Sequence, residues 1–227
     1  MRAIFISIDR SPKPNYMADT EASFLSNGGG DFTVLVGNDS ASYLQSSKGT
    51  VIPLQAEEAS ALAVYPLRFR GATNYARMIS HELETAPEDL LACEDDIQFT
   101  CDFRRKLQKA LTSVPVKRFI LTLYSAHNLN GKPIDEINPR SFFGTQAIFF
   151  PWVIRRDLAL YYKRRLAAWT KDIPVSFVTY DMVLADFCRE NSIPIYACNP
   201  SLVQHTGLLS TGFTPDDRQH RSPSFKP

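Results

Sequence analysis

The segment LLACEDDIQFTCDF, residues 90–103, sets both the fold and the chemistry that the sequence predicts. Its apolar run Leu90–Cys93 has the length and character of a buried strand. The run ends in three adjacent acids, Glu94, Asp95 and Asp96, and apolar residues resume at Ile97. Three neighbouring carboxylates repel one another. A turn open to water would tolerate them, and so would a bound cation that offsets their charge.

Apolar runs of strand length alternate along the chain with segments of helical spacing. Strands are expected at 3–8, 32–37, 49–54, 90–93, 118–125, 145–150 and 193–198, and helices before the glycines at 28–30 and at 74–86, 103–114, 152–169 and 176–191. Asp102 is expected to cap the helix that follows it. This alternation predicts an α/β fold with a mostly parallel central sheet flanked by helices. Residues 1–227 are expected to form one domain, in which the loop-like stretch 126–140 and the segment 199–227 are expected to be irregular.

The bulk composition excludes several classes of protein. The chain has 227 residues and a net charge of +1, so its overall charge does not favour binding to nucleic acid or to membrane surfaces. No run approaches the ~20 apolar residues of a membrane span, and the first apolar run ends at Asp9, too early for a signal peptide. Three of the four cysteines sit in apolar contexts, and none forms a C-x-x-C pair. We therefore expect a cytoplasmic protein, in a bacterium or in the cytoplasm of a phage's host.

The acids after Cys93 fall where α/β sheets bind their ligands. In open sheets of this kind, ligands lie beyond the carboxyl ends of the strands. Clustered carboxylates at such an end suit Mg²⁺ or Mn²⁺, which also bind phosphate oxygens. The alternative is a solvated turn in which Asp96 acts as a cap. A second polar segment, PSLVQHTG at 200–207, carries Gln204 and His205.

These segments, taken in chain order, carry a resemblance to a known family. AIFISIDR, GATNYARMIS, LLACEDDI, FFGTQAIFF, YDMVLADFC, PSLVQHTGLLS and RSPSF resemble GT-A fold glycosyltransferases. The likeness is to the lipopolysaccharide-type galactosyltransferases and related N-acetylglucosaminyltransferases above all, and it covers most of the chain. It implies a single GT-A-like (Rossmann-like) domain that transfers a hexose or N-acetylhexosamine. The donor is a nucleoside-diphosphate sugar, with a UDP-sugar expected, and the acceptor is a hydroxyl group.

The resemblance also implies a metal site for Mn²⁺ or Mg²⁺. Asp96 is expected as the direct ligand, and His205 as a further one. Glu94 or Asp95 would contact ribose or a metal-bound water, with Glu94 as the additional metal ligand. The acids differ from the strict D-x-D pattern, which leaves open which two of the three bind the metal.

The donor-binding positions implied by the resemblance are Ser7, Ile8, Asp9, Arg10, Arg68, Asn74, Arg77, Glu94, Asp95, Gly144, Thr145, Gln146 and Arg221. The first strand's end would line the base and ribose, and the segment 144–146 would line the sugar. Arg70 is an alternative to Arg68, and Arg218 to Arg221. Helix caps, a glycine turn and solvated charges explain the same residues equally well. The segment 199–227 either folds over the donor or is disordered.

Asp181 is the candidate general base, aligned with the acid that inverting members of the family place at the start of a helix. The alternative is that Asp181 is there because aspartate favours helix N-termini. Asp186, five residues on, is expected on a solvated face.

The acceptor is the least determined part of the sequence. The basic cluster Arg155, Arg156, Lys163, Arg164 and Arg165 is either the solvated face of an amphipathic helix or a guide for DNA. A phage-type enzyme that modifies hydroxymethylated bases fits, as does a transferase acting on a glycan or a protein. Two further functions use the same residues: a metal-dependent phosphodiesterase or nuclease, and a catalytically silent module that binds nucleotide sugars.

Overall fold

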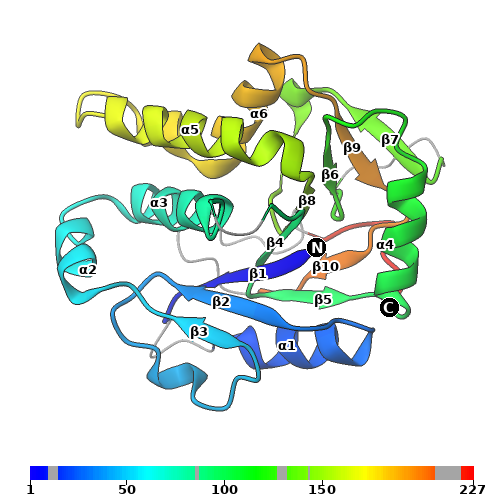
Figure 1. The fold of residues 1–227 in the computed structure, drawn as a ribbon, viewed down its shortest axis with the longest axis horizontal. Coiled ribbons are helices and arrows are strands. Elements are labelled where there is room, and N and C mark those ends of the chain that lie inside the picture. Colours follow the sequence, from blue (N-terminus) through cyan, green and yellow to red (C-terminus); the bar gives the residue numbers. More distant parts are fainter. Residues whose placement is uncertain (10–14, 85–86, 127–131, 143, 208–220) are drawn as a thin grey trace.

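The computed structural model describes residues 1–9, 15–84, 87–126, 132–142, 144–207 and 221–227. Their centre is an eight-stranded sheet in the order β3-β2-β1-β4-β8-β6-β9-β7 (Figure 1). The strands are β1 (Arg2–Ser7), β2 (Phe32–Val36), β3 (Thr50–Ile52), β4 (Leu90–Glu94), β6 (Ile120–Thr122), β7 (Ile134–Ile137), β8 (Ala147–Phe150) and β9 (Ile195–Cys198). A separate two-stranded sheet pairs β5 (Ile97–Phe99) with β10 (Val203–His205).

Helices cover both faces of the large sheet (Figure 1). One face packs against α1 (Met17–Ser26) and α4 (Phe103–Thr112), and the other against α3 (Leu67–Ser80), α5 (Trp152–Ala168) and α6 (Tyr180–Glu190). The remaining helical elements are α2 (Ala56–Leu62), η1 (Ser42–Leu44), η2 (Pro139–Ser141) and η3 (Val175–Val178). Side chains alternate across a strand, so in β1 Phe5 joins the α1 side of the core and Ile4 joins the α3 side.

The sheet has the mostly parallel character that the sequence predicts. β3, β2, β1 and β4 pair in parallel, and so do β6 and β9. β8 is antiparallel to both β4 and β6. The residues before β8 therefore lie at the same edge of the sheet as the residues after β1 and β4. This edge collects Ser7, the acids 94–96 and the segment 144–146.

Several local predictions were wrong. α3 covers 67–80 instead of 74–86. The stretches assigned as irregular contain two strands, β7 within 126–140 and β10 within 199–227. Asp102 precedes α4 but does not cap it: its backbone is left-handed, with φ of 53°, and its carboxylate accepts a hydrogen bond from Arg105 at 2.7 Å.

The basic cluster on α5 is not one solvated face. Arg155 is 1% exposed. Its guanidinium donates to the backbone carbonyls of Glu88 at 2.7 Å, Ile79 at 3.0 Å and His81 at 3.1 Å. Helical spacing alone could not show this, because the accepting carbonyls belong to the end of α3 and to the segment between α3 and β4.

Arg165 and Asp186 also have structural roles. Arg165 lies 3.8 Å above the Phe177 ring and pairs with Asp186 at 3.0 Å. Asp186 also pairs with Arg189 at 2.7 Å, so this acid is half-buried in an ion-pair network and not solvated as expected. Within the described ranges, no helix is both long enough and apolar enough to cross a membrane.

Replacing Arg155 with methionine is expected to lower the free energy of unfolding by about 3 kcal/mol, because three buried carbonyls lose their donor. The neighbouring substitution Arg156→Met is the matched control, since Arg156 is exposed; it should change stability by less than about 0.5 kcal/mol. Urea unfolding followed by circular dichroism measures both. If both variants lost the same free energy of unfolding, the structural role of Arg155 would be contradicted.

Candidate metal and donor site

The acids of residues 94–96 form the turn between β4 and β5. The side chain of Thr20 in α1 makes hydrogen bonds to the backbone of this turn. Its hydroxyl lies 2.8 Å from the carbonyl oxygen of Asp95 and 2.9 Å from that of Ile97, and it accepts a hydrogen bond from the Ile97 amide at 3.0 Å. The buried Thr20 thus fixes the backbone conformation of the turn that carries the three carboxylates.

The pairing of β10 with β5 brings His205 to this turn. His205 stands opposite Ile97 in the antiparallel register. The next residue, Thr206, donates from both its amide and its hydroxyl to the carbonyl oxygen of Asp96, at 2.8 and 2.9 Å. The His205 Nε2 atom consequently lies 3.3 Å from Asp96 Oδ2.

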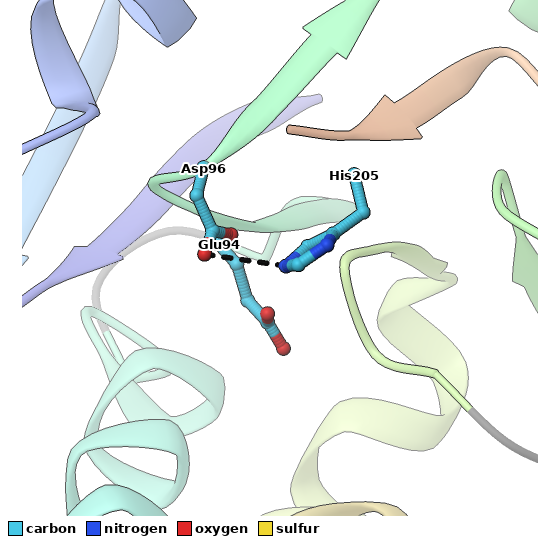
Figure 2. A group of neighbouring side chains, drawn as sticks. All are labelled: Glu94, Asp96 and His205. Atoms are coloured by element: carbon cyan, nitrogen blue, oxygen red, sulfur yellow. Dashed lines mark ion pairs between the residues drawn. The ribbon is translucent and has the colours of Figure 1, made fainter. Parts of the chain in front are cut away.

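Glu94, Asp96 and His205 form a group that is able to hold a divalent cation. One ligand atom from each lies within 4.8 Å of the others. Figure 2 shows the two carboxylates facing the His205 imidazole. Carboxylate oxygens with one imidazole nitrogen suit a divalent metal ion, so the residues present fit the metal that the sequence implies.

The electrostatics of Glu94 are consistent with a cation in this position. Burial, followed by the negative charge of Asp96, raises the pKa of Glu94 to about 7. The charge of His205 and a hydrogen bond from the Thr145 hydroxyl, at 2.9 Å, act in the opposite direction. Near neutral pH this carboxyl is therefore partly protonated, and a divalent cation held beside it would favour its ionised form.

Asp95 has a different environment from its two neighbours. It is buried and accepts a hydrogen bond from the Ser7 hydroxyl at 2.5 Å, and Ser7 accepts one from Tyr43 at 2.8 Å. Asp95 thus faces the end of β1, whereas Glu94 and Asp96 face His205. Tyr43 and Thr20 were not found from the sequence, because nothing in their local pattern distinguishes them from other hydroxyl-bearing residues.

Gly207 packs directly against the metal group. A Cβ atom at this position would overlap Asp96 Oδ2 and would lie 3.0 Å from Asp96 Cγ. Only a residue without a side chain leaves the Asp96 carboxylate where it is, so this glycine is required for close approach.

The predicted nucleotide-binding residues of the first strands lie at one corner of this edge. The Asp9 amide donates to the Asn38 side chain at 2.9 Å, and the Gly37 amide to the Ser7 carbonyl at 2.8 Å. Asn74 of α3 lies against Gly37. Its Oδ1 atom is buried and has no hydrogen-bond partner among the described residues. Ile8 follows β1 and is half-buried.

The segment before β8 lines the other side of the acids. The Gln146 carbonyl accepts a hydrogen bond from the Glu94 amide at 2.8 Å. Thr145 binds the Glu94 side chain, and Gly144 has a positive φ of 98°. The side-chain oxygen of Gln146 is buried without a hydrogen-bond partner in the described part of the chain.

The predicted arginines are distributed differently. Arg77 donates to the backbone carbonyls of Val36, Ile52 and Pro53, so its guanidinium is engaged in holding β2 and β3. Arg68 lies half-buried in the first turn of α3, near Arg70. Arg221 is exposed at the start of the C-terminal segment. Arg10 and Arg218 lie outside the described residues.

The C-terminal segment returns to β10. Ser222 donates from its amide to Gln204 at 2.8 Å and from its hydroxyl to Ser201 at 2.7 Å, and Ser201 donates from its amide to Ser224 at 3.0 Å. The predicted covering of the donor falls largely on residues 208–220, which lie outside the described residues.

Asp181 lies in the first turn of α6, and its Oδ1 atom accepts a hydrogen bond from the Met182 amide at 2.8 Å. The preceding residue, Tyr180, is close to the acids: the charge of Glu94 is the main cause that raises the Tyr180 pKa well above its ordinary value. Tyr180 also stacks on Tyr75 of α3, with ring centroids 5.0 Å apart. The start of α6 is therefore within electrostatic range of the metal group, although Asp181 is not part of it.

Comparisons with known proteins identify the fold. No model of a protein family matches the chain, and no curated protein does. Among solved structures, the chain is similar to a nucleotidyl transferase from Methanothermobacter thermautotroptrophicus (TM-score 0.51, 12% identity, 87% of this chain and 85% of that one). It is also similar to mouse xyloside xylosyltransferase 1 in its apo form, with a TM-score of 0.52 and 8% identity over 87% of this chain and 84% of that one. A third similar structure is an active-site mutant of LgtC, with a TM-score of 0.54 and 12% identity over 100% of this chain and 85% of that one. At these identities the likeness establishes the fold, which is the GT-A-type α/β fold expected from the sequence.

The substitution Gly207→Ala is expected to weaken Mn²⁺ binding by about 10- to 100-fold, because the new methyl group displaces the Asp96 carboxylate. Gly30→Ala is the matched control, since a Cβ atom there meets nothing within 4 Å. Isothermal titration calorimetry with Mn²⁺ measures both variants below their melting temperatures. Equal affinities would show that Asp96 does not bind the ion.

Proposed function

We propose that this chain is a metal-dependent glycosyltransferase that moves a sugar from a nucleoside-diphosphate sugar, a UDP-sugar above all, to an acceptor hydroxyl. The observation that carries the proposal is the convergence of Glu94, Asp96 and His205 at the carboxyl edge of a GT-A-type sheet. Two segments far apart in the sequence, one at the end of β4 and one in β10, meet at this point.

The polar groups around the acids support a donor site at the same edge. Asn74 Oδ1 and Gln146 Oε1 are buried and have no hydrogen-bond partner among the described residues. Buried polar atoms usually have a partner, so atoms of this kind are suited to receive a ligand's donors. Asn74, with Ser7 and Asp9, is the candidate contact for the nucleoside, and Gln146, with Thr145, for the sugar.

Asp96, Glu94 and His205 would hold Mn²⁺ or Mg²⁺, which neutralises the diphosphate leaving group as a Lewis acid. Asp95 would act differently, since it is bonded to Ser7 at the end of β1. In this proposal Asp95 fixes the end of the strand on which the nucleoside rests.

Asp181 is the proposed general base, which makes the reaction inverting. The acceptor oxygen forms a bond to the anomeric carbon of the sugar, while the bond from that carbon to the diphosphate oxygen breaks. The acceptor's proton passes to the Asp181 carboxylate, and the nucleoside diphosphate leaves with the electron pair. Asp181 follows Tyr180, whose pKa is raised chiefly by the charge of Glu94, and this electrostatic proximity to the acids supports the assignment.

A thermal-shift experiment tests the class of reaction. UDP with Mn²⁺, at about 100 times its dissociation constant, should raise the melting temperature by about 5–10 °C, and a chelator should remove the shift. Asp96→Asn should abolish it, whereas Asp19→Asn, an exposed acid on α1, should retain it. Release of UDP from a UDP-sugar supports the proposal. No shift with any sugar nucleotide, or cleavage of phosphodiesters without one, would contradict it.

The substitution Asp181→Asn is expected to lower kcat for sugar transfer by about 10²- to 10⁴-fold, because the acceptor loses its proton acceptor. Binding of UDP and Mn²⁺ should be unchanged, since Asp181 is outside the metal group. Asp157→Asn is the matched control: Asp157 is an exposed helix residue that pairs with Arg118. Steady-state kinetics with a UDP-sugar measure both variants, and a kcat for Asp181→Asn near the native value would exclude Asp181 as the base.

A further inference from the structure

A groove lies where the start of α3 faces the end of α5. It has a volume of about 630 Å³ and is lined by Trp169 and the segments 64–66 and 171–175. Figure 1 shows the N-terminal end of α3 and the C-terminal end of α5 at the same end of the molecule. None of these residues belongs to the metal and donor site described above.

Aromatic rings form one wall of the groove. Tyr65 stacks on Phe69 with centroids 4.4 Å apart and an interplanar angle of 16°, and Trp169 lies 4.9 Å from Phe69. The indole N–H of Trp169 donates to the Ile173 carbonyl at 3.0 Å, which fixes the orientation of its ring. Tyr65 is 38% exposed and Val64 is 77% exposed. Rigid apolar surface is thus open to solvent here, where burial by a ligand would be favourable.

The charges of the groove are balanced. Lys171 and Asp172 are adjacent, exposed and of opposite sign. A phosphate-bearing ligand such as DNA would favour an excess of basic residues. None of the five basic residues of the α5 cluster lines the groove: Arg155 is buried, Arg165 is paired with Asp186, and the other three are exposed elsewhere on α5. The groove therefore suits an uncharged ligand that carries hydrogen-bonding groups.

The helix α3 connects this groove to the donor site. Phe69 precedes Tyr75 by six residues, which is about 9 Å along a helix axis. Tyr75 stacks on Tyr180, and the charge of Glu94 is the main cause that raises the pKa of Tyr180. Along α3, the Phe69 ring at the groove and the Tyr75–Tyr180 stack are therefore about 9 Å apart. A short oligosaccharide spans such a distance.

We propose that this groove binds the non-reacting sugars of a neutral oligosaccharide acceptor. This inference rests on the proposed function and names its acceptor class. A pyranose ring presents C–H groups on one face and hydroxyls around its rim. The C–H face packs on Tyr65 and Trp169, and the hydroxyls bond to Lys171 and Asp172. Binding energy from these remote sugars positions the reacting hydroxyl at the donor.

Tryptophan fluorescence tests the proposal. The chain has two tryptophans, so Trp152→Phe leaves Trp169 as the reporter. Cellotriose, maltotriose, chitotriose and lactose are titrated to about 10 mM, with and without UDP and Mn²⁺, which detects Kd values near 1 mM. At least one should quench or shift the emission saturably. In the same background, Tyr65→Ala should raise the Kd by about tenfold.

Two further variants separate binding from folding. Val64→Asp changes a side chain that is 77% exposed, so it leaves the fold intact and should still weaken sugar binding. Leu160→Ala, at an exposed position of α5 away from the groove, is the matched control and should bind normally. The single variant Trp152→Phe provides the reference Kd for all of these double variants.

The outcomes separate this inference from the proposed function. No response to any of the four sugars, or a response only to duplex DNA or to a peptide, would overturn the groove assignment. If UDP and Mn²⁺ still raise the melting temperature in that case, the glycosyltransferase proposal stands without it. Sugar binding at Trp169 without any response to sugar nucleotides would support the groove and contradict the donor site.

Discussion

The pairing of β5 with β10 is the contact on which the candidate site depends. Only three residue pairs join these strands, yet they place His205 opposite Ile97 and bring Thr206 onto the Asp96 carbonyl. Without this ribbon, the acids would form a turn at the edge of the sheet and the histidine would belong to a distant segment. The ribbon therefore converts two separate polar segments into one group of possible ligands.

The same group is costly for the folded chain when no cation is present. Glu94 is partly withdrawn from water beside Asp96, and its raised pKa expresses the unfavourable charge. Functional sites commonly retain such features, which are offset elsewhere in the structure. Here hydrogen bonds and core packing offset this cost. Thr20 bonds to the backbone of the turn and Thr145 to the Glu94 carboxylate, and aromatic side chains fill the core on the α1 side of the sheet.

The sequence was informative where a single local pattern determines the outcome. The apolar runs of β1, β2 and β4 correctly predicted buried strands, and the position of the acids after β4 predicted the edge where ligands gather. β5, β7 and β10 were missed because polar residues interrupt them (IQF, IDEI and VQH), so none has the continuous apolar run by which the other short strands were predicted. Arg155 was misplaced for a related reason: periodicity assigns a charged residue to the solvent, and only the assembled structure supplies the three carbonyls that its guanidinium binds.

The helix α3 contributes to both halves of the proposed active centre. One of its ends carries Phe69, which packs between Tyr65 and Trp169 of the groove, and its middle carries Asn74 and Tyr75 beside the strand ends. A helix transmits position rigidly along its axis, because every backbone hydrogen bond within it is satisfied locally. One continuous element, α3, therefore contacts both the groove and the donor site. In the proposed arrangement α3 would hold the remote sugars at a fixed distance from the donor, and the length of the acceptor would become a determinant of specificity.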